Sequence, residues 1–168
     1  MHKLVAGMGA AIALTAGAAY AQNSAWGYFE GENGLLQAGV GNAEGQQIIL
    51  KCDEDGNNKV YAAIHSPDSL AGVQQRPPAR DVKLQFDGGR IVDTRFRYHP
   101  NTAIALNNRR ESVLSDLLGP MADANEVTIW LDPEDGTEIR MTFTVTGARD
   151  AINRVFESCG DNASPVAQ

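Results

Sequence analysis

The sequence predicts a mainly β domain, either an antiparallel β-sandwich or a strongly bent sheet, with two short helices. From about residue 35 to residue 145, most segments are short and alternate between apolar and polar residues. Clusters of Gly, Asn, Asp and Pro separate these segments, as turns do between strands. Only two segments show apolar side chains at the three-to-four-residue spacing of a helix that faces a core.

Three pairs of alternating segments have the form of β-hairpins. In the clearest pair, residues 81–87 and 91–98 are joined through Gly88-Gly89. Glycine adopts the left-handed backbone conformations of a tight turn without steric cost. The other two pairs join residues 46–52 to 59–65 and residues 126–132 to 137–145. We therefore expect antiparallel sheet throughout.

Two helices are expected, one in the second half of the chain and one near its end. The first begins at Asn108, where Glu111 completes the spacing of a capping box, and Gly119-Pro120 is a stop signal. The second covers residues 148–159, and Gly160 occupies the position just past its end. Their apolar stripes are Val113, Leu114, Leu117 and Leu118 in the first helix, and Ala148, Ile152, Val155, Phe156 and Cys159 in the second.

The N-terminal segment, residues 1–21, has the three zones of a cleavable export signal. A short basic start is followed by an uncharged Ala/Gly/Leu-rich run and by Ala19-Tyr20-Ala21, an A-x-A cleavage site. Several glycines make the run too weakly apolar to favour a retained membrane anchor. We expect cleavage before Gln22 and a mature protein in the periplasm or outside the cell, with no membrane span.

An exported protein with two cysteines, Cys52 and Cys159, is expected to form one disulfide, because oxidising compartments preserve such bonds. Two unrelated buried thiols are the alternative. The bond would tie the C-terminal helix to the end of a core strand. Closing a loop of this length corresponds to roughly 4 to 5 kcal/mol by the chain-entropy argument.

Size and charge limit the architecture and the partners. Residues 22–160 suit a single β-rich domain, and the small polar residues 161–168 suggest a disordered tail. The formal net charge of the whole chain is −7, and loss of Lys3 with the signal makes the mature protein more acidic. Such a surface repels phosphate backbones, which disfavours nucleic acid as a partner.

No catalytic, metal-binding or cofactor motif emerges. Asp53, Asp55 and Asn57 alternate as in a calcium loop, but the required glycine and bidentate glutamate are missing. His65 and His99 lack the spacing of zinc ligands. No nucleophile elbow or phosphate-binding glycine pattern occurs. We therefore assign no catalytic residue, no metal and no cofactor.

A cluster of basic residues is the candidate binding surface: Arg95, Arg97, His99, Arg109 and Arg110. These residues would form a basic patch for an acidic partner or glycan. The alternative, which we favour, is an ordinary mixed solvent face in which Asp87, Asp93 and Glu111 pair with them.

An aromatic group follows the predicted cleavage site and comprises Trp26, Tyr28 and Phe29. These side chains would either form a platform for a ligand or pin the first strand to the core, and we favour the second interpretation.

The layout of the chain resembles that of small exported proteobacterial proteins, the invasion-associated locus B family and a type VI secretion accessory family. The resemblance rests on Trp26, on a first cysteine in residues 50–53, and on a closing strand, glycine and helix that lead from residues 141–148 to Cys159. It implies a disulfide-stabilised, β-rich envelope protein and carries no catalytic signature.

We therefore expect a non-enzymatic periplasmic or secreted binding module. Its partner would be another envelope protein or a cell-wall component, bound through a sheet face or the Arg95/Arg97 region. The alternative is a small periplasmic hydrolase or an inhibitor of one. An enzyme would show a cleft with convergent carboxylates or histidines, whereas a binding module would show an exposed apolar or charged patch.

Overall fold

The computed structural model describes residues 26–31, 34–53, 59–108, 110–134 and 136–166. The predicted export signal and its cleavage site lie outside these residues. The described chain forms nine strands and two helices. The strands are β1 (Gly27–Glu30), β2 (Leu36–Gly41), β3 (Gln47–Cys52), β4 (Val60–His65), β5 (Ala79–Phe86), β6 (Val92–Tyr98), β7 (Thr102–Ala105), β8 (Glu126–Leu131) and β9 (Ile139–Thr144), and the helices are α1 (Val113–Met121) and α2 (Ala148–Cys159).

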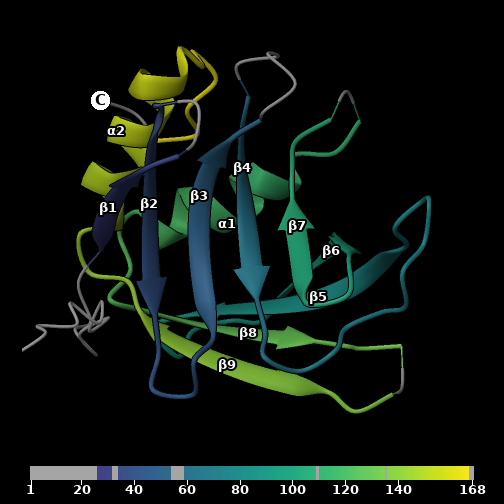
Figure 1. Ribbon diagram of the computed structural model, residues 1–168. Coiled ribbons are helices and arrows are strands. Elements are labelled where there is room, and N and C mark those ends of the chain that lie inside the picture. The colour runs from purple at the N-terminus through teal and green to yellow at the C-terminus, as the bar shows by residue number, and fades with distance from the viewer. Residues whose placement is uncertain (1–25, 32–33, 54–58, 109, 135, 167–168) are drawn as a thin grey trace, which may run out of the picture.

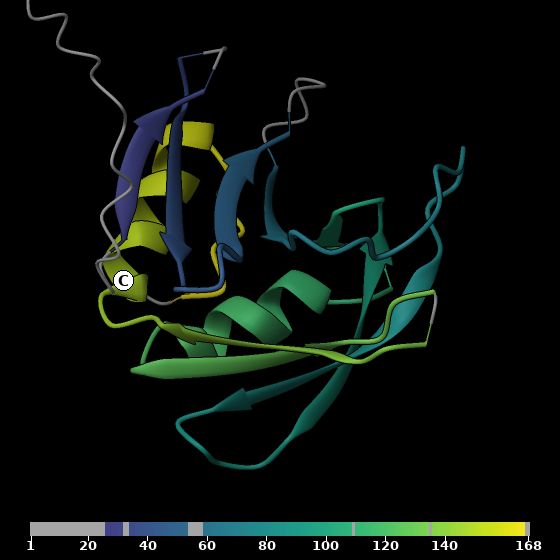
Figure 2. The same ribbon diagram turned by 60° about the horizontal axis from the view of Figure 1, so that its bottom comes forward.

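All nine strands belong to one antiparallel sheet with the order β1-β2-β3-β4-β7-β6-β5-β8-β9. Figures 1 and 2 show that the sheet bends into two arms, one from β1 to β7 and the other from β6 to β9, with the helices between them. The arms join where β6 pairs with β7, through Arg97–Ile104 and Tyr98–Ala103. The mainly β prediction is confirmed, and the architecture is the bent sheet.

The bend brings the outer ends of the two arms together. The Asn42 side-chain amide, just after β2, donates to the Thr142 carbonyl in β9 over 3.2 Å. The indole N–H of Trp26 donates to the Val145 carbonyl, which follows β9, over 3.3 Å. These bonds hold the sheet as a half-closed barrel around its core.

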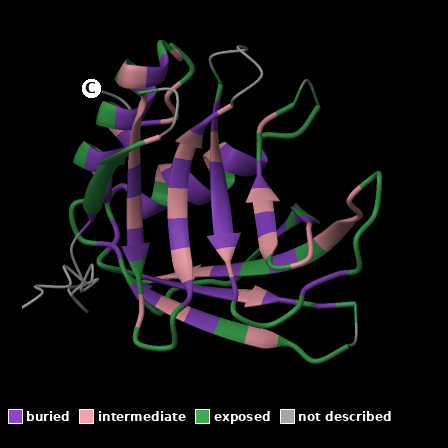
Figure 3. Ribbon diagram, viewed as in Figure 1, coloured by how far each residue is buried: buried purple, intermediate pink, exposed green. Residues whose placement is uncertain are grey.

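The core lies between the arms, and the alternation of each strand sends every second side chain into it. Helix α2 packs against β2, β3 and β4, and α1 packs against β5, β6 and β7. Figure 3 shows the resulting alternation of buried and exposed positions along the strands. The predicted inward sets of the last hairpin are buried as expected, including Val127, Ile129, Leu131, Met141 and Phe143.

The 81–98 hairpin forms as predicted, with β5 and β6 in antiparallel register. Its turn takes left-handed backbone angles at two successive residues, Asp87 (φ 48°) and Gly88 (φ 67°). Asp87 also fixes the neighbouring hairpin, because its carboxylate accepts hydrogen bonds from the amides of Asn125 and Glu126, each 2.9 Å away.

The predicted bounds are correct for one helix and wrong for the other. Helix α2 has the predicted bounds, and Gly160 ends it in a left-handed conformation. Helix α1 instead begins at Val113 and continues through the expected stop at Gly119-Pro120 to Met121. Because the Asn107 side chain accepts from the amides of Leu114 and Ser115, the first turn is satisfied from outside the helix. The predicted contact between Asn108 and Glu111 forms, with Glu111 N donating to Asn108 Oδ1 over 3.0 Å, but it lies in the loop before the helix and does not begin it.

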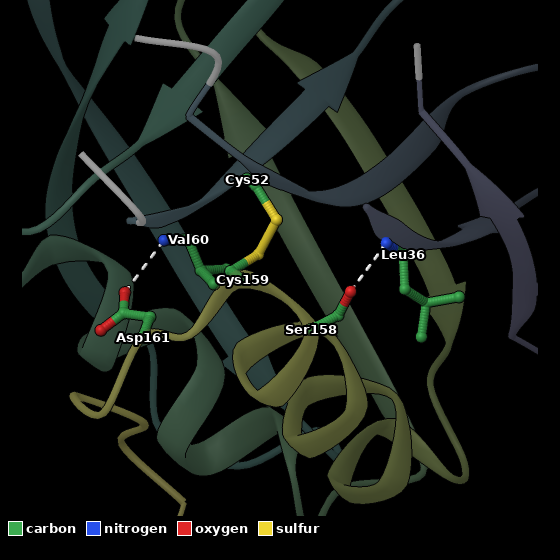
Figure 4. The surroundings of a disulfide bond; sticks show 6 residues. All are labelled: Leu36, Cys52, Val60, Ser158, Cys159 and Asp161. Carbon is green, nitrogen blue, oxygen red and sulfur yellow. Dashed lines mark hydrogen bonds between the residues drawn. A yellow bond between two sulfur atoms is a disulfide. The ribbon is translucent and has the colours of Figure 1, made fainter. Parts of the chain in front are cut away.

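The disulfide between Cys52 and Cys159 is formed, and it joins the end of β3 to the end of α2. Two hydrogen bonds flank it, as Figure 4 shows. Leu36 N donates to Ser158 Oγ over 2.9 Å, and Val60 N donates to Asp161 Oδ2 over 3.0 Å. The C-terminal end of α2 is therefore fastened to β2, β3 and β4 at adjacent points.

Residues 161–166, which we expected to be a disordered tail, lie against the domain. Asp161 accepts the Val60 amide and also caps Ala163 N through its other carboxylate oxygen. Val166 is buried and belongs to the core cluster. Composition alone predicted disorder because it does not show that Asp161 bonds to Val60 or that Val166 is buried.

Tyr98 is a buried polar link between β6 and β8. Its side chain is fully buried, and its hydroxyl oxygen accepts a hydrogen bond from Asp132 N over 3.0 Å. Burial raises the pKa of Tyr98 from its ordinary value of 10.0 to about 12. The phenol therefore keeps its proton in the folded protein over a range where an unfolded tyrosine loses it.

This difference predicts a loss of stability in alkali. Because the folded pKa is raised, the Tyr98 contribution is complete below pH 10 and is lost as the pH rises through about 12. The loss is on the order of 2 kcal/mol. Urea denaturation at several pH values should show this slope in the wild type and a smaller one in Tyr98→Phe. An unchanged slope would show that other groups control alkaline unfolding.

Candidate functional site

The outer face of β5, β6, β8 and β9 carries a row of functional side chains. Register places Asp93 opposite Lys83, Lys83 opposite Trp130, and Trp130 opposite Arg140, so four strands each contribute one residue. These residues alternate with the inward side chains of the core and therefore point away from it. We call this outer surface the Trp130 face.

A shallow, open hollow of about 650 Å³ lies on the Trp130 face. Most of its lining side chains are charged, and both signs are present. The lining residues are Asp81, Lys83, Asp93, Thr94, Arg95, Trp130, Asp132 and Glu138.

Ion pairs across strands fix three of the four lining carboxylates. Arg95 Nε lies 3.2 Å from Asp81, Arg80 Nη2 lies 3.1 Å from Asp132, and Lys83 Nζ lies 2.9 Å from Glu138. The hydrogen bond to Glu138 and the charge of that carboxylate raise the pKa of Lys83. Because the pair joins Lys83 on β5 to Glu138, the residue just before β9, it crosses β8 close to Trp130.

Asp93 differs from the other lining carboxylates. Among the described residues it forms no hydrogen bond or ion pair, although its charge contributes to the raised pKa of Lys83. It stands on β6, the strand at the rim of the hollow. Asp93 is therefore the lining carboxylate that is most free to accept a donor from a partner.

Trp130 is half-buried in the middle of this charged surface. The Arg140 guanidinium lies 5.7 Å from its ring centroid, within the range of a cation–π contact. An indole in this setting offers a flat apolar surface for stacking, and the surrounding ions offer hydrogen-bond donors and acceptors.

The basic residues singled out from the sequence are only partly brought together. Arg95 and Arg97 share the outer face of β6, and Arg97 donates to the Pro77 carbonyl over 3.1 Å. His99 lies in the turn after β6, and Arg110 lies in the loop before α1, where its amide donates to Asn108. Neither of these lines the hollow. Arg109 lies outside the described residues.

Of the three acids expected to pair with these bases, Asp87 and Glu111 have other partners, and Asp93 forms no ion pair among the described residues. Arg95 pairs with Asp81, whereas Asp87 accepts two backbone amides and Glu111 accepts from the Asn108 side chain over 2.7 Å. Both acidic and basic side chains lie around Arg95, but its ion-pair partner is Asp81, not one of the acids named from the sequence. Cross-strand neighbours, not sequence neighbours, determine them.

Sequence reasoning missed Arg80, Trp130 and Arg140. A signal was present, because the alternation of 126–132 sends Val127, Ile129 and Leu131 inward and so places Trp130 outward. An aromatic side chain on a predicted solvent face marks a candidate binding surface. Arg80 and Arg140 belong to the Trp130 face because of the order of the strands, which could not be predicted from the sequence.

The aromatic group near the N-terminus is divided between two roles. Trp26 is buried and pins the chain to Val145, as we favoured for the group. Tyr28 and Phe29 are exposed on edge strand β1. The Tyr28 hydroxyl donates to Asp150 over 3.0 Å, and partial burial together with this bond raises the pKa of Tyr28. Arg154 stacks 5.0 Å from the Tyr28 centroid, so this ring fastens β1 to α2.

Within the described part of the chain, no group of three or more His, Cys, Asp or Glu side chains is arranged to hold a metal ion. The acidic turn after Asp53 lies largely outside the described residues. None of the described helices is long and apolar enough to cross a membrane.

No family model matches this sequence, and no curated protein does so either. Among solved structures, the chain is similar to invasion associated protein B from Bartonella henselae, with a TM-score of 0.49 and 13% sequence identity. The match covers 79% of this chain and 92% of that chain. It is a distant structural resemblance and assigns neither a family nor an activity to this protein.

Proposed function

We propose that this protein is an exported, non-enzymatic binding or accessory protein of the bacterial envelope. It works in the periplasm or outside the cell and contacts an envelope protein or a cell-wall component through the Trp130 face. The observation that carries the proposal is the hollow around Trp130, where a half-buried indole on β8 stands among charged groups contributed by β5, β6 and β9.

The chemistry of the Trp130 face suits recognition of a polar ligand. The indole can stack on a sugar ring or an apolar side chain, while Lys83, Arg95 and Asp93 supply donors and acceptors beside it. The ion pairs hold Lys83 and Arg95 in place before binding, which lowers the ordering cost of association.

The disulfide supports the proposed location. Structural disulfides persist in oxidising compartments outside the cytoplasm, and the Cys52–Cys159 bond closes most of the domain. Together with the predicted export signal, it favours a protein that folds after export.

Trp130→Ala is expected to weaken partner binding at least about tenfold, because central aromatic side chains dominate many interfaces. Oxidised protein of residues 22–168 would be immobilised and exposed to envelope extract and to purified peptidoglycan, and the retained material would be quantified. Phe29→Ala, which removes an exposed ring from the other arm, is the matched control and should bind like the wild type. Equal retention by Trp130→Ala, or turnover in a hydrolase panel, would overturn the proposal.

A further inference from the structure

Strand β6 has an open edge on the side away from β5. Strand β7 pairs with it only at Arg97 and Tyr98, so residues 92–96 have no neighbouring strand there among the described residues. The Tyr98 amide donates toward β5, to the Pro78 carbonyl. Because backbone groups alternate in direction along a strand, the amides and carbonyls of Asp93 and Arg95 point to the open edge.

We propose that this edge pairs with the same edge of a second copy of the chain. The two β6 strands run antiparallel around a two-fold axis that passes beside Thr94. In this register Asp93 of each copy lies opposite Arg95 of the other, and the two Thr94 residues face each other. Asp93 and Arg95 are the residues whose backbone groups point outward, so they occupy the hydrogen-bonded positions of the new ladder.

Charge complementarity favours a second copy of the chain as the partner of the open β6 edge. The Asp93 and Arg95 side chains lie on the same outer face, so two-fold pairing sets a carboxylate against a guanidinium twice. Asp93 has no ion pair of its own within the described chain. Arg95 contacts Asp81 and the Ala79 carbonyl, which uses only part of the five N–H donors of a guanidinium.

Exposed apolar side chains lie where the second copy would cover them. Ile91 and Val92 are 45% and 41% exposed, and Leu106, just after the end of β7, is 39% exposed. Figure 2 shows the tip of the β5–β6 hairpin projecting from the molecule. In the proposed register the two Val92 residues lie at the two ends of the short ladder, so the pairing covers exposed apolar surface there.

The dimer would join two Trp130 faces into one surface. A two-fold axis perpendicular to the sheet keeps both outer faces on the same side, so four strands of each copy form a continuous sheet. A partner with repeated binding groups would then engage both hollows, which increases avidity without new contacts. This consequence for binding rests on the proposed function, whereas the dimer itself does not.

Charge reversal tests the proposed register directly. Sedimentation velocity of oxidised residues 22–168 should show a reversible dimer with a dissociation constant of about 1 to 100 µM, as expected for a small interface. Asp93→Arg and Arg95→Asp should each weaken dimerisation at least about tenfold, since each sets like charges opposite one another. An equimolar mixture of the two variants should restore dimerisation, because every facing pair is then complementary.

A second pair of variants tests the backbone ladder. Arg95→Pro removes an amide that points to the open edge and takes no part in pairing with β5, so the fold should persist. It should dimerise at least about tenfold more weakly than Arg95→Ala, which loses the same side chain but keeps the amide. Circular dichroism and the thiol content of each variant would verify that the fold and disulfide remain.

The proposal is overturned if the wild type stays monomeric up to about 0.5 mM. It is also overturned if the folded single variants dimerise like the wild type, or if their mixture fails to associate. Sedimentation needs no partner, so a dimer without retention of envelope material would contradict the proposed function alone. Retention that depends on Trp130 in a monomeric protein would contradict the dimer alone.

Discussion

Reduction of the Cys52–Cys159 disulfide is expected to lower the free energy of unfolding by about 4 to 5 kcal/mol, because the bond closes a loop with a sequence separation of 107 residues. A cross-link across so much of the chain restricts the unfolded ensemble more than the folded one. Since small domains have only about 5 to 15 kcal/mol of net stability, this bond accounts for a large fraction of it.

Urea denaturation with and without reductant measures this effect. The double variant with Cys52→Ala and Cys159→Ala should unfold at nearly the same urea concentration as the reduced wild type and should not respond to reductant. Thiol labelling of the denatured, oxidised protein should modify neither cysteine until reductant is added. Coincident unfolding of oxidised and reduced protein would show that the bond does not stabilise the fold.

Phe143→Ala is expected to destabilise the domain by about 3 to 5 kcal/mol, through lost burial and the cavity left behind. Phe143 is fully buried on β9, where it faces the core between the two arms of the sheet. Among the described strands, β9 pairs only with β8, so the inward side chains are the main attachment of this edge to the core. We therefore expect loss of this ring to loosen β9 before the rest of the sheet.

The same substitution at Phe29 provides the control. Phe29 lies on the opposite edge strand and is 44% exposed. Phe29→Ala should cost less than about 1 kcal/mol because little apolar surface returns to water. Denaturation midpoints would be compared in oxidised protein, and amide hydrogen exchange would identify the strand that opens first. Similar losses for both variants would mean that burial in the core does not control the stability of the two edges.

Local patterns were sufficient for much of the fold. Alternation predicted the inward set of β8 and β9, and the backbone freedom of glycine accounts for the left-handed conformation of Gly88 in the turn between β5 and β6. Helix α2 was placed from its apolar stripe and its final Gly160. Each of these features depends on residues that are near one another in the chain, so a single sequence contains the necessary information.

Strand β7 was missed and the bounds of helix α1 were misplaced, because both depend on contacts with distant parts of the chain. Strand β7 has only four residues and exists because β4 and β6 flank it. Helix α1 extends past Gly119-Pro120, where its apolar residues remain buried against the second arm. In both cases tertiary packing outweighs the local signal.

The candidate site likewise combines local features that the sequence predicts with neighbours that only the folded structure provides. The sequence placed Arg95 and Arg97 on one face of a strand, but it did not give the neighbours of that strand. Asp81 lies beside Arg95, and Trp130 lies beside Lys83, because β5 is sandwiched between β6 and β8. The hollow around Trp130 therefore depends on a strand order that follows from long-range pairing.

By itself the sequence determined the β-rich class, the pairing of two cysteines, the hairpin turns and the inward face of most strands, since these follow from local periodicity and backbone sterics. The tertiary structure alone decided that one sheet bends around both helices, that residues 161–166 pack against it, and that β6 keeps an open edge. Those features depend on which distant strands become neighbours, and the free energy that selects them comes from burying the whole core at once.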